Sequence, residues 1–404
     1  MAKIALLEGA TLAWARERFA EYYRSAAIPP PERLDRREFA AFPFAVETGM
    51  RRHTTLRSPE EFHRFLVREI PRHVYYSTAY YRLPAEPTMA RKEWIGADLI
   101  FDLDADHLRG AEGLDYAAQL DLVKTRLRDL IDDFLVRDFG IDPAEMAIVF
   151  SGGRGYHVHV HDPRFLPMTS PERRELVDYI QGTGFDARRA VAARHLTTGG
   201  EDGRRMSSVR LQELPSPDDP GWRGRTGRAV VSLLDRWAES GRAVDDLVAW
   251  GVPRPAARKM AHRLFEEGGA ASIRSTRSLQ VLPGPLQERF LEAVVPRAAV
   301  EVQGETDAPV TTDVHRLIRL PGSLHGGTGF RVLPLTRSQL DAFDPLVDGP
   351  VPGPARARTD VLLSETVAYR FGTEPVAGPA GARLELPTPA ALFLCLRGEA
   401  ALPP

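Results

Sequence analysis

Two aspartates near the end of an apolar run have the spacing of a metal-binding pair. In DLIFDLDAD, Asp102 and Asp104 are two residues apart, so on a β-strand their side chains project from the same face. Carboxylates of this kind bind Mg²⁺ or Mn²⁺, and two such ions about 3.5–4 Å apart support phosphoryl transfer to a 3′-hydroxyl. Asp98 and Asp106 are also separated from this pair by even numbers of residues, so on a strand they would project from the same face. Spacing alone therefore leaves open which two of the four acids are ligands.

A glycine-rich segment, SGGRGYHVHV, has the composition of a phosphate-binding turn. It begins with Ser151 and Gly152, and Arg154 and His157 supply side-chain donors. Its glycines let backbone N–H groups approach an anion. Because the segment lacks both the lysine and the spacing of a P-loop, a Walker-type NTPase is disfavoured. A plain glycine-rich hairpin turn is the alternative interpretation.

A third segment, TDAPVTTDVHRLIRLPGSLHGGTG, combines acids with cations. Asp307 and Asp313 precede Arg316, Arg319 and His325. Arginine and histidine side chains of this kind bind phosphate oxygens, although a structural ion-pair network would use the same residues. Local chemistry does not choose between the two aspartates as a third carboxylate.

The cysteine content excludes several kinds of site. Cys395 is the only cysteine, so the chain forms no intrachain disulfide and no site built from several thiolates. His157, His159 and His161 alternate along one strand and could present three imidazoles to zinc. Histidines on a strand more often form local hydrogen bonds, so we expect no structural zinc.

Hydrophobic periodicity predicts the elements that position these residues. Three-to-four spacing indicates helices, and β-branched or aromatic runs flanked by glycine indicate strands. Ser58, Pro59 and Glu61 form a typical helix start, and Gly140 is the expected stop of a later helix. The sequence predicts helices over 11–25, 58–70 and 116–140, a strand over 97–107, a strand, turn and strand over 147–162, and strands within 308–335.

Composition indicates a folded protein rather than a membrane-spanning or disordered one. Of the 404 residues, 43% are hydrophobic and 27% are charged, which is ordinary for globular proteins. No run approaches the roughly 20 apolar residues that a membrane helix needs, and the N-terminus lacks the regions of a signal peptide. We therefore expect a cytoplasmic protein without a membrane partner. The net charge of −2 leaves nucleic-acid binding undecided.

Together, the FDLDAD, SGGRGYH and RLIRLPGSLH blocks resemble the small catalytic subunit of archaeal and eukaryotic DNA primases, the archaeal form more than the eukaryotic. The resemblance implies catalytic and metal-binding roles for Asp102, Asp104 and Asp307, because the family's third acid lies a few residues before the R-L-x-R-x-P-x-S-x-H segment. REFAAF and MRRH look like nucleotide-contacting segments of that family. The nucleotide-binding residues implied by all these matches are Ser151, Gly152, Arg154, His157, Arg319, His325, Glu38, Arg52 and His53.

The resemblance also implies a fold and a set of partners. We expect a mixed α/β (α+β) fold, with a catalytic core at 1–165 and 300–404 interrupted by a mainly helical insertion at 166–299. Many relatives carry a cysteine-rich zinc knuckle that this chain lacks. The implied activity is primer synthesis on single-stranded DNA from nucleoside triphosphates, with Mg²⁺ or Mn²⁺ at a two-metal site and a primase large subunit as heterodimer partner. A repair-type polymerase of the same superfamily and a non-catalytic nucleic-acid-binding module are the alternatives.

Overall fold

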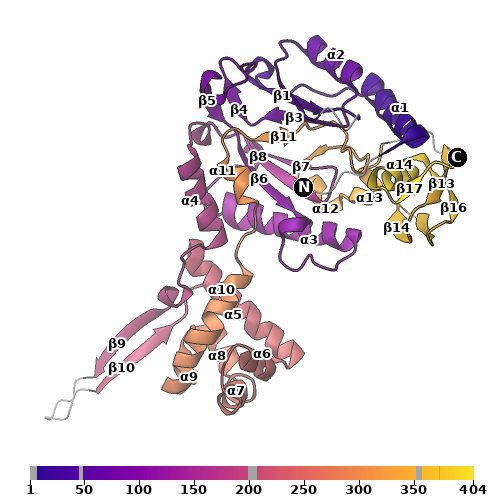
Figure 1. Ribbon diagram of the computed structural model, residues 1–404. Helices are drawn as coiled ribbons and strands as arrows, with labels where there is room; N and C mark the ends of the chain where they lie inside the picture. The colour runs from indigo at the N-terminus through magenta and orange to yellow at the C-terminus, as the bar shows by residue number, and fades with distance from the viewer. Residues whose placement is uncertain (1–6, 45–48, 199–206, 352–356, 373) are drawn as a thin grey trace. The chain divides into compact units, whose positions relative to one another are not determined.

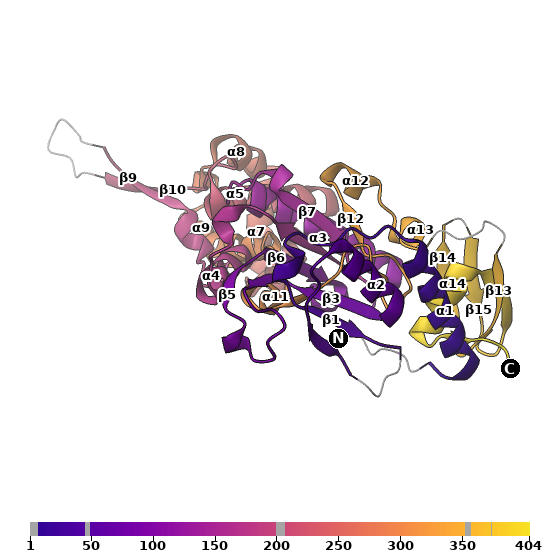
Figure 2. The ribbon, with the colours of Figure 1, turned by 90° about the horizontal axis from the view of Figure 1, so that it is seen from above.

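The chain folds into two units, drawn as ribbons in Figure 1 and Figure 2. The computed structural model describes residues 7–44, 49–198, 207–351, 357–372 and 374–404. The first unit, called the core unit below, comprises 1–131, 141–177 and 305–404, and the second, the helical unit, comprises 132–140 and 178–304. Helices and antiparallel sheets occur together in the core unit, so the expected mixed α/β class is confirmed. None of the helices in the described ranges is long and apolar enough to cross a membrane.

Two four-stranded antiparallel sheets organise the core unit. The N-terminal sheet has the order β11-β3-β1-β2, and the central sheet has the order β12-β7-β8-β6. The central sheet therefore contains the strand that carries the D-x-D pair and both strands that flank the glycine-rich turn. The strands of these two sheets are β1 (Phe39–Phe42), β2 (Arg51–Thr54), β3 (His73–Ser77), β6 (Leu99–Asp104), β7 (Met146–Phe150), β8 (Gly155–Val160), β11 (Leu317–Arg319) and β12 (Leu333–Leu335).

Two helices pack against the N-terminal sheet, as Figure 1 shows: α1 (Gly9–Ser25) and α2 (Pro59–Glu69). Phe19 and Tyr23 of α1 are fully buried, which is the face expected from their spacing. The Ser58 hydroxyl accepts a hydrogen bond from the Glu61 N–H at 3.2 Å, with Pro59 at the first helical position. Both predicted helices, and the predicted start of the second, are confirmed.

A helix of the core unit packs against the central sheet at β6 and β8. This helix, α3 (Tyr116–Asp129), buries Leu120, Val123 and Leu127. The predicted helix over 116–140 is helical as far as Val136, but Leu130–Val136 is π-helical rather than α-helical, and a turn then leads to Gly140, whose φ is +63°. No proline or glycine precedes this change, so periodicity alone gave no sign of it.

The remaining elements of the core unit lie outside the two four-stranded sheets. A buried C-terminal helix, α14 (Thr388–Arg397), contains Cys395, which is fully buried. The other elements are β4 (Ala79–Tyr81), β5 (Trp94–Ala97), α11 (Ala308–Thr312), α12 (Arg337–Ala342), α13 (Pro345–Asp348), β13 (Arg358–Leu363), β14 (Val367–Phe371), β15 (Glu374–Gly378), β16 (Arg383–Pro387) and β17 (Ala400–Ala401).

The helical unit has its own hydrophobic core, in which Trp237 and Phe290 are buried. It also contains an antiparallel pair of strands that the helical pattern did not predict. Its elements are β9 (Ala192–Thr198), β10 (Ser207–Glu213), α5 (Gly221–Ser240), α6 (Ala243–Ala249), α7 (Arg254–Ala261), α8 (Gly269–Thr276), α9 (Gly284–Arg289) and α10 (Val295–Glu301).

The limits of this unit differ from the expected 166–299. Helix α4 (Ser170–Gln181) begins in the core unit, because Arg173 donates to the carbonyl oxygens of Asp98 and Ala97 at 2.8 and 2.7 Å. Residues 132–140 belong to the helical unit, where the Arg225 guanidinium pairs with Asp138. The contacts of Arg173 and Arg225 are both buried and join residues far apart in the sequence, so local sequence patterns do not reveal them.

Candidate active site

The D-x-D pair lies at the end of β6, as the alternation predicted. Asp102 and Asp104 share one face of the strand, and in the ladder Asp102 lies opposite His157 of β8. The Asp102 side chain is 18% exposed. Burial and repulsion by the Asp104 and Asp307 carboxylates raise its pKa from 3.8 to about 7, which Arg316 and Arg319 only partly offset. The carboxylates of Asp102, Asp104 and Asp307 are therefore close enough to influence one another at this end of the strand.

The third carboxylate that lies close to this pair is Asp307. Its backbone N–H donates to the Asp102 carbonyl oxygen at 2.8 Å, and it directly precedes α11. Asp313, at the other end of α11, is exposed and accepts a hydrogen bond from the His315 N–H at 2.9 Å.

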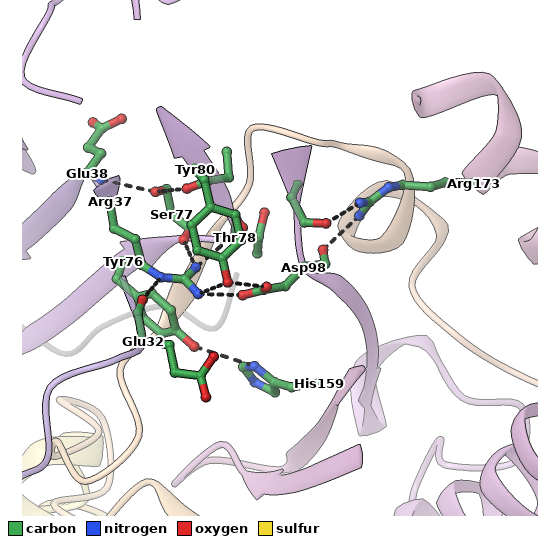
Figure 3. A network of polar contacts seen from close by, with 12 residues as sticks. Glu32, Arg37, Glu38, Tyr76, Ser77, Thr78, Tyr80, Asp98, His159 and Arg173 are labelled. Atoms are coloured by element: carbon green, nitrogen blue, oxygen red, sulfur yellow. Dashed lines mark hydrogen bonds and ion pairs between the residues drawn. The ribbon is translucent and has the colours of Figure 1, made fainter. Parts of the chain in front are cut away.

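Spacing admitted four acids as metal ligands, and two of them, Asp98 and Asp106, are bonded to other groups. Asp98 is buried, and its two oxygens accept from the Arg37 guanidinium at 2.7 Å and the Tyr80 hydroxyl at 2.6 Å, as Figure 3 shows. Asp106 is exposed and pairs with Arg154 at 2.5 Å. The four acids of equal parity thus divide into a site pair and two acids with structural partners.

In the described ranges, no three or more His, Cys, Asp or Glu side chains are placed so that they could hold a metal ion as they stand. The site does bring three carboxylates close enough to influence one another, because those of Asp104 and Asp307 add to the effect of burial in raising the pKa of Asp102. Of the alternating histidines, His159 is buried 3.4 Å from the Tyr76 hydroxyl, whereas His161 is exposed.

Close packing explains the glycines of the turn between β7 and β8. Gly152 has a φ of +75°, and a Cβ there would lie 2.7 Å from the His325 Cβ. The Ser151 hydroxyl accepts from the N–H groups of Gly153 and Gly155 at 3.2 and 3.3 Å. Two backbone donors that could have bound an anion are therefore used inside the turn, so Ser151 shapes it.

A cluster of basic groups surrounds this turn. The Arg319 guanidinium donates to His73 Nδ1 at 2.5 Å, and the His325 ring lies edge-on to His73 with 5.2 Å between centroids. Burial and the nearby charges of Arg319, Arg72 and other groups hold the pKa of His325 well below 6.5. The arginines thus supply the positive charge, and this imidazole is neutral.

His157 joins the basic cluster to the aspartates. Its Nε2 lies 3.4 Å from Asp102 Oδ1, and its Nδ1 is buried without a hydrogen-bond partner. Burial and the neighbouring His159, Arg319 and Arg316 hold its pKa well below 6.5. The imidazole at this position is therefore neutral, and one of its nitrogens has no partner within the part of the chain that the structure describes.

Sequence patterns did not single out His73 or Arg72 of this cluster. Both are buried, and the Arg72 Nε donates to the Gly326 carbonyl oxygen at 2.8 Å. The only local signal was the basic pair Arg72 and His73, which directly precedes the aromatic residues of β3. Its position beside Arg319 follows from the pairing of β3 with β11, which is a long-range feature.

Glu38, Arg52 and His53 form a separate cluster on the N-terminal sheet. Glu38 is fully buried and pairs with Arg52 at 3.0 Å, His53 at 3.3 Å and Lys92 at 3.3 Å. Burial alone would raise the Glu38 pKa, but the hydrogen bond from Arg52 and the charges of Lys92 and Arg52 lower it. These residues contact one another, and the structure shows no pairing between them and the aspartates in the described ranges.

The chain is similar to known proteins over nearly its whole length. Residues 101–337, more than half of the chain, match the family model of the DNA primase small subunit. The DNA primase small subunit PriS of Methanocella arvoryzae is 40% identical, with 96% of this chain and 98% of that protein covered. Those of Methanothrix thermoacetophila and Halobacterium salinarum are each 39% identical, with 98% of this chain and 99% of the relative covered. The polymerase domain of Mycobacterium tuberculosis Ligase D in complex with DNA is 14% identical with a TM-score of 0.32, covering 84% of this chain and 88% of its own, which is too weak to bear on the fold.

Proposed function

Because the chain belongs to the DNA primase small-subunit family, we propose that it is a nucleotidyltransferase that joins nucleoside triphosphates into primers on single-stranded DNA. The observation that carries this proposal is the meeting of Asp102, Asp104 and Asp307 beside a cluster of arginines and neutral histidines. Carboxylates are needed where metal ions bind, and basic donors are needed where phosphates bind. The two sets of groups lie next to each other at His157.

The three aspartates would hold two divalent cations, Mg²⁺ or Mn²⁺. When bound, such ions lower the pKa of an attacking 3′-hydroxyl and neutralise charge on the triphosphate. Asp102 would be the shared ligand, because its backbone bonds to Asp307 and its strand carries Asp104. Burial, together with repulsion by Asp104 and Asp307, raises the pKa of Asp102 to about 7, and cation binding would relieve the repulsion.

The basic cluster would orient the triphosphate. Arg319 and Arg154 would contribute charge, and the neutral rings of His157 and His325 would contribute hydrogen bonds. In the N-terminal cluster, Arg52 and His53 are 35% and 31% exposed, whereas Glu38 is fully buried. Arg52 and His53 would therefore contact a nucleotide, and Glu38 would hold them in place.

The family also supports a proposal about assembly. Relatives of this chain are named as small subunits of a primase, so we expect a primase large subunit to form a heterodimer with it. The single-stranded template would be its second macromolecular partner.

Primer synthesis on unprimed template tests the proposed function. Purified protein is incubated with single-stranded DNA, nucleoside triphosphates and either Mg²⁺ or Mn²⁺, and the products are resolved by length. New short chains are expected only when a metal is present. Incorporation restricted to templates with an existing 3′ end would indicate a repair-type polymerase. Salt-dependent binding of single-stranded DNA without any incorporation would indicate a non-catalytic module.

Arg154→Ala and His157→Ala are expected to weaken nucleotide binding more than they slow the chemical step. Each removes a donor to the triphosphate and leaves all three carboxylates in place. Loss of a charge-assisted hydrogen bond should raise the nucleotide Kd about tenfold or more for Arg154, and loss of a neutral one should raise it a few-fold for His157. The measurement is nucleotide affinity by titration, separate from the single-turnover rate.

Arg164→Ala provides a matched arginine control. Its guanidinium pairs with Asp162 at 2.6 Å and its side chain is 65% exposed, so nucleotide affinity should not change. Unchanged affinity in both the Arg154 and the His157 variants would remove the turn from the nucleotide site.

A further inference from the structure

The segment that carries Asp307 is held to the end of β6 by three successive residues. The Asp307 N–H donates to the Asp102 carbonyl oxygen at 2.8 Å, and the Thr306 hydroxyl donates to the same oxygen at 3.2 Å. The Glu305 carboxylate accepts two hydrogen bonds from Arg109, from its backbone N–H at 3.0 Å and from Nε at 3.1 Å. The Glu305–Arg109 pair is called the clasp below.

The clasp joins the two segments that supply the carboxylates. Arg109 follows Asp104 by five residues, and Glu305 precedes Asp307 by two. Asp307 lies on no strand of the central sheet, because α11 follows it directly and β11 belongs to the N-terminal sheet. A strand ladder fixes Asp104 relative to Asp102, whereas Asp307 is held by the contacts of residues 305–307 and by the packing of α11 against β6.

The Glu305 carboxylate is largely buried, so its contacts differ from those of an exposed ion pair. Its side chain is 9% exposed, and Arg126 of α3 lies 3.7 Å from the same oxygen that Arg109 Nε contacts. A carboxylate taken out of water is costly unless its oxygens are bonded to donors or cations. Repulsion among Asp102, Asp104 and Asp307 would push Asp307 outward, and the clasp opposes that movement.

We infer that Glu305 is a positioning residue that keeps Asp307, the third carboxylate, beside Asp102 and Asp104 for metal binding. This inference rests on the proposed metal-binding role of the three aspartates. Residues that orient metal ligands without touching the metal typically change metal affinity about 10–100-fold when they are replaced. Glu305 would act in this way, through the backbone of residues 305–307.

Direct Mn²⁺ binding without nucleotide or DNA tests the inference. Electron paramagnetic resonance of free Mn²⁺ gives its Kd for the wild-type chain, Glu305→Gln, Arg109→Ala and the double variant. Glu305→Gln should raise the Mn²⁺ Kd about tenfold, and Arg109→Ala, which keeps the backbone donor, should raise it less. The double variant should resemble Glu305→Gln alone, because the two residues act as one unit. Nucleotide affinity should stay within about twofold of wild type.

Asp341→Asn is the matched control for charge removal. Asp341 pairs with Arg128 of α3 at 2.7 Å and is 58% exposed, so Mn²⁺ affinity should not change. Wild-type Mn²⁺ affinity in Glu305→Gln would overturn the inference, even if the melting temperature fell. If Glu305→Gln does not fold, an unchanged Kd in Arg109→Ala, whose side chain is half exposed, would overturn it equally. Normal Mn²⁺ affinity in Asp102→Asn and Asp307→Asn would instead remove the proposed metal site itself.

Discussion

Asp102→Asn and Asp104→Asn each lower the rate of nucleotide incorporation by about 10³-fold or more, which corresponds to about 4 kcal/mol of lost transition-state stabilisation. An amide keeps the size of the side chain but removes the negative charge that a divalent cation requires. Asp104 also accepts from the Asp106 N–H at 3.1 Å, and an asparagine oxygen can accept the same bond. Single-turnover incorporation at saturating nucleotide and metal is the measurement.

Thermal unfolding separates this loss from misfolding. Burial and the two neighbouring carboxylates raise the pKa of Asp102 to about 7, so its ionised form is less favourable in the folded chain than in the unfolded one. In metal-free buffer this costs stability that grows as pH rises from about 4 to about 7. Asp102→Asn should therefore stabilise the metal-free protein by roughly 1–3 kcal/mol at pH 8 and have little effect near pH 4. Near-normal incorporation by either aspartate variant would exclude that residue as a metal ligand.

The strands that carry the candidate site were predictable because their signals are local. An apolar run that ends in alternating aspartates predicted β6, and glycines between β-branched and aromatic residues predicted the β7-turn-β8 unit. The α1 and α2 helices followed from spacing and capping in the same way. The π-helical break at Leu130–Val136 could not be predicted, since the segment contains neither proline nor glycine. Strand β10 did carry a signal, because SSVRLQE alternates, but the many arginines favoured a helical interpretation.

The composition of the site was predictable only where it follows from spacing. Parity placed Asp102 and Asp104 on one face but also admitted Asp98, whose partner Arg37 lies 61 residues earlier in the chain. The buried arrangement around Asp98 in Figure 3 brings together residues from the segment before β1 and from β3, β4 and β8. His73 was missed for the same reason, because only the pairing of β3 with β11 brings it to Arg319.

The choice between Asp307 and Asp313 as third carboxylate could not be made from local chemistry, and the structure distinguishes their surroundings. Asp307 contributes to the raised pKa of Asp102, and its N–H bonds to the Asp102 carbonyl oxygen. Asp313 is exposed at the opposite end of α11 and accepts from the His315 N–H. If two metal ions need a carboxylate facing the D-x-D pair, only Asp307 has the right surroundings.

Asp307→Asn should abolish metal-dependent primer synthesis while the chain stays folded, because its bond to Asp102 uses the backbone and its side chain caps no helix. Asp313→Asn should keep at least about a tenth of the activity, a barrier change of at most about 1.4 kcal/mol, since asparagine can still accept from His315. Incorporation rates and circular dichroism melting curves of both variants, measured side by side, decide the assignment. Full activity in Asp307→Asn together with loss in a folded Asp313→Asn would move the third ligand to Asp313. The Glu305 clasp would then have no role in metal binding. The clasp holds residues 305–307, whereas Asp313 lies at the other end of α11.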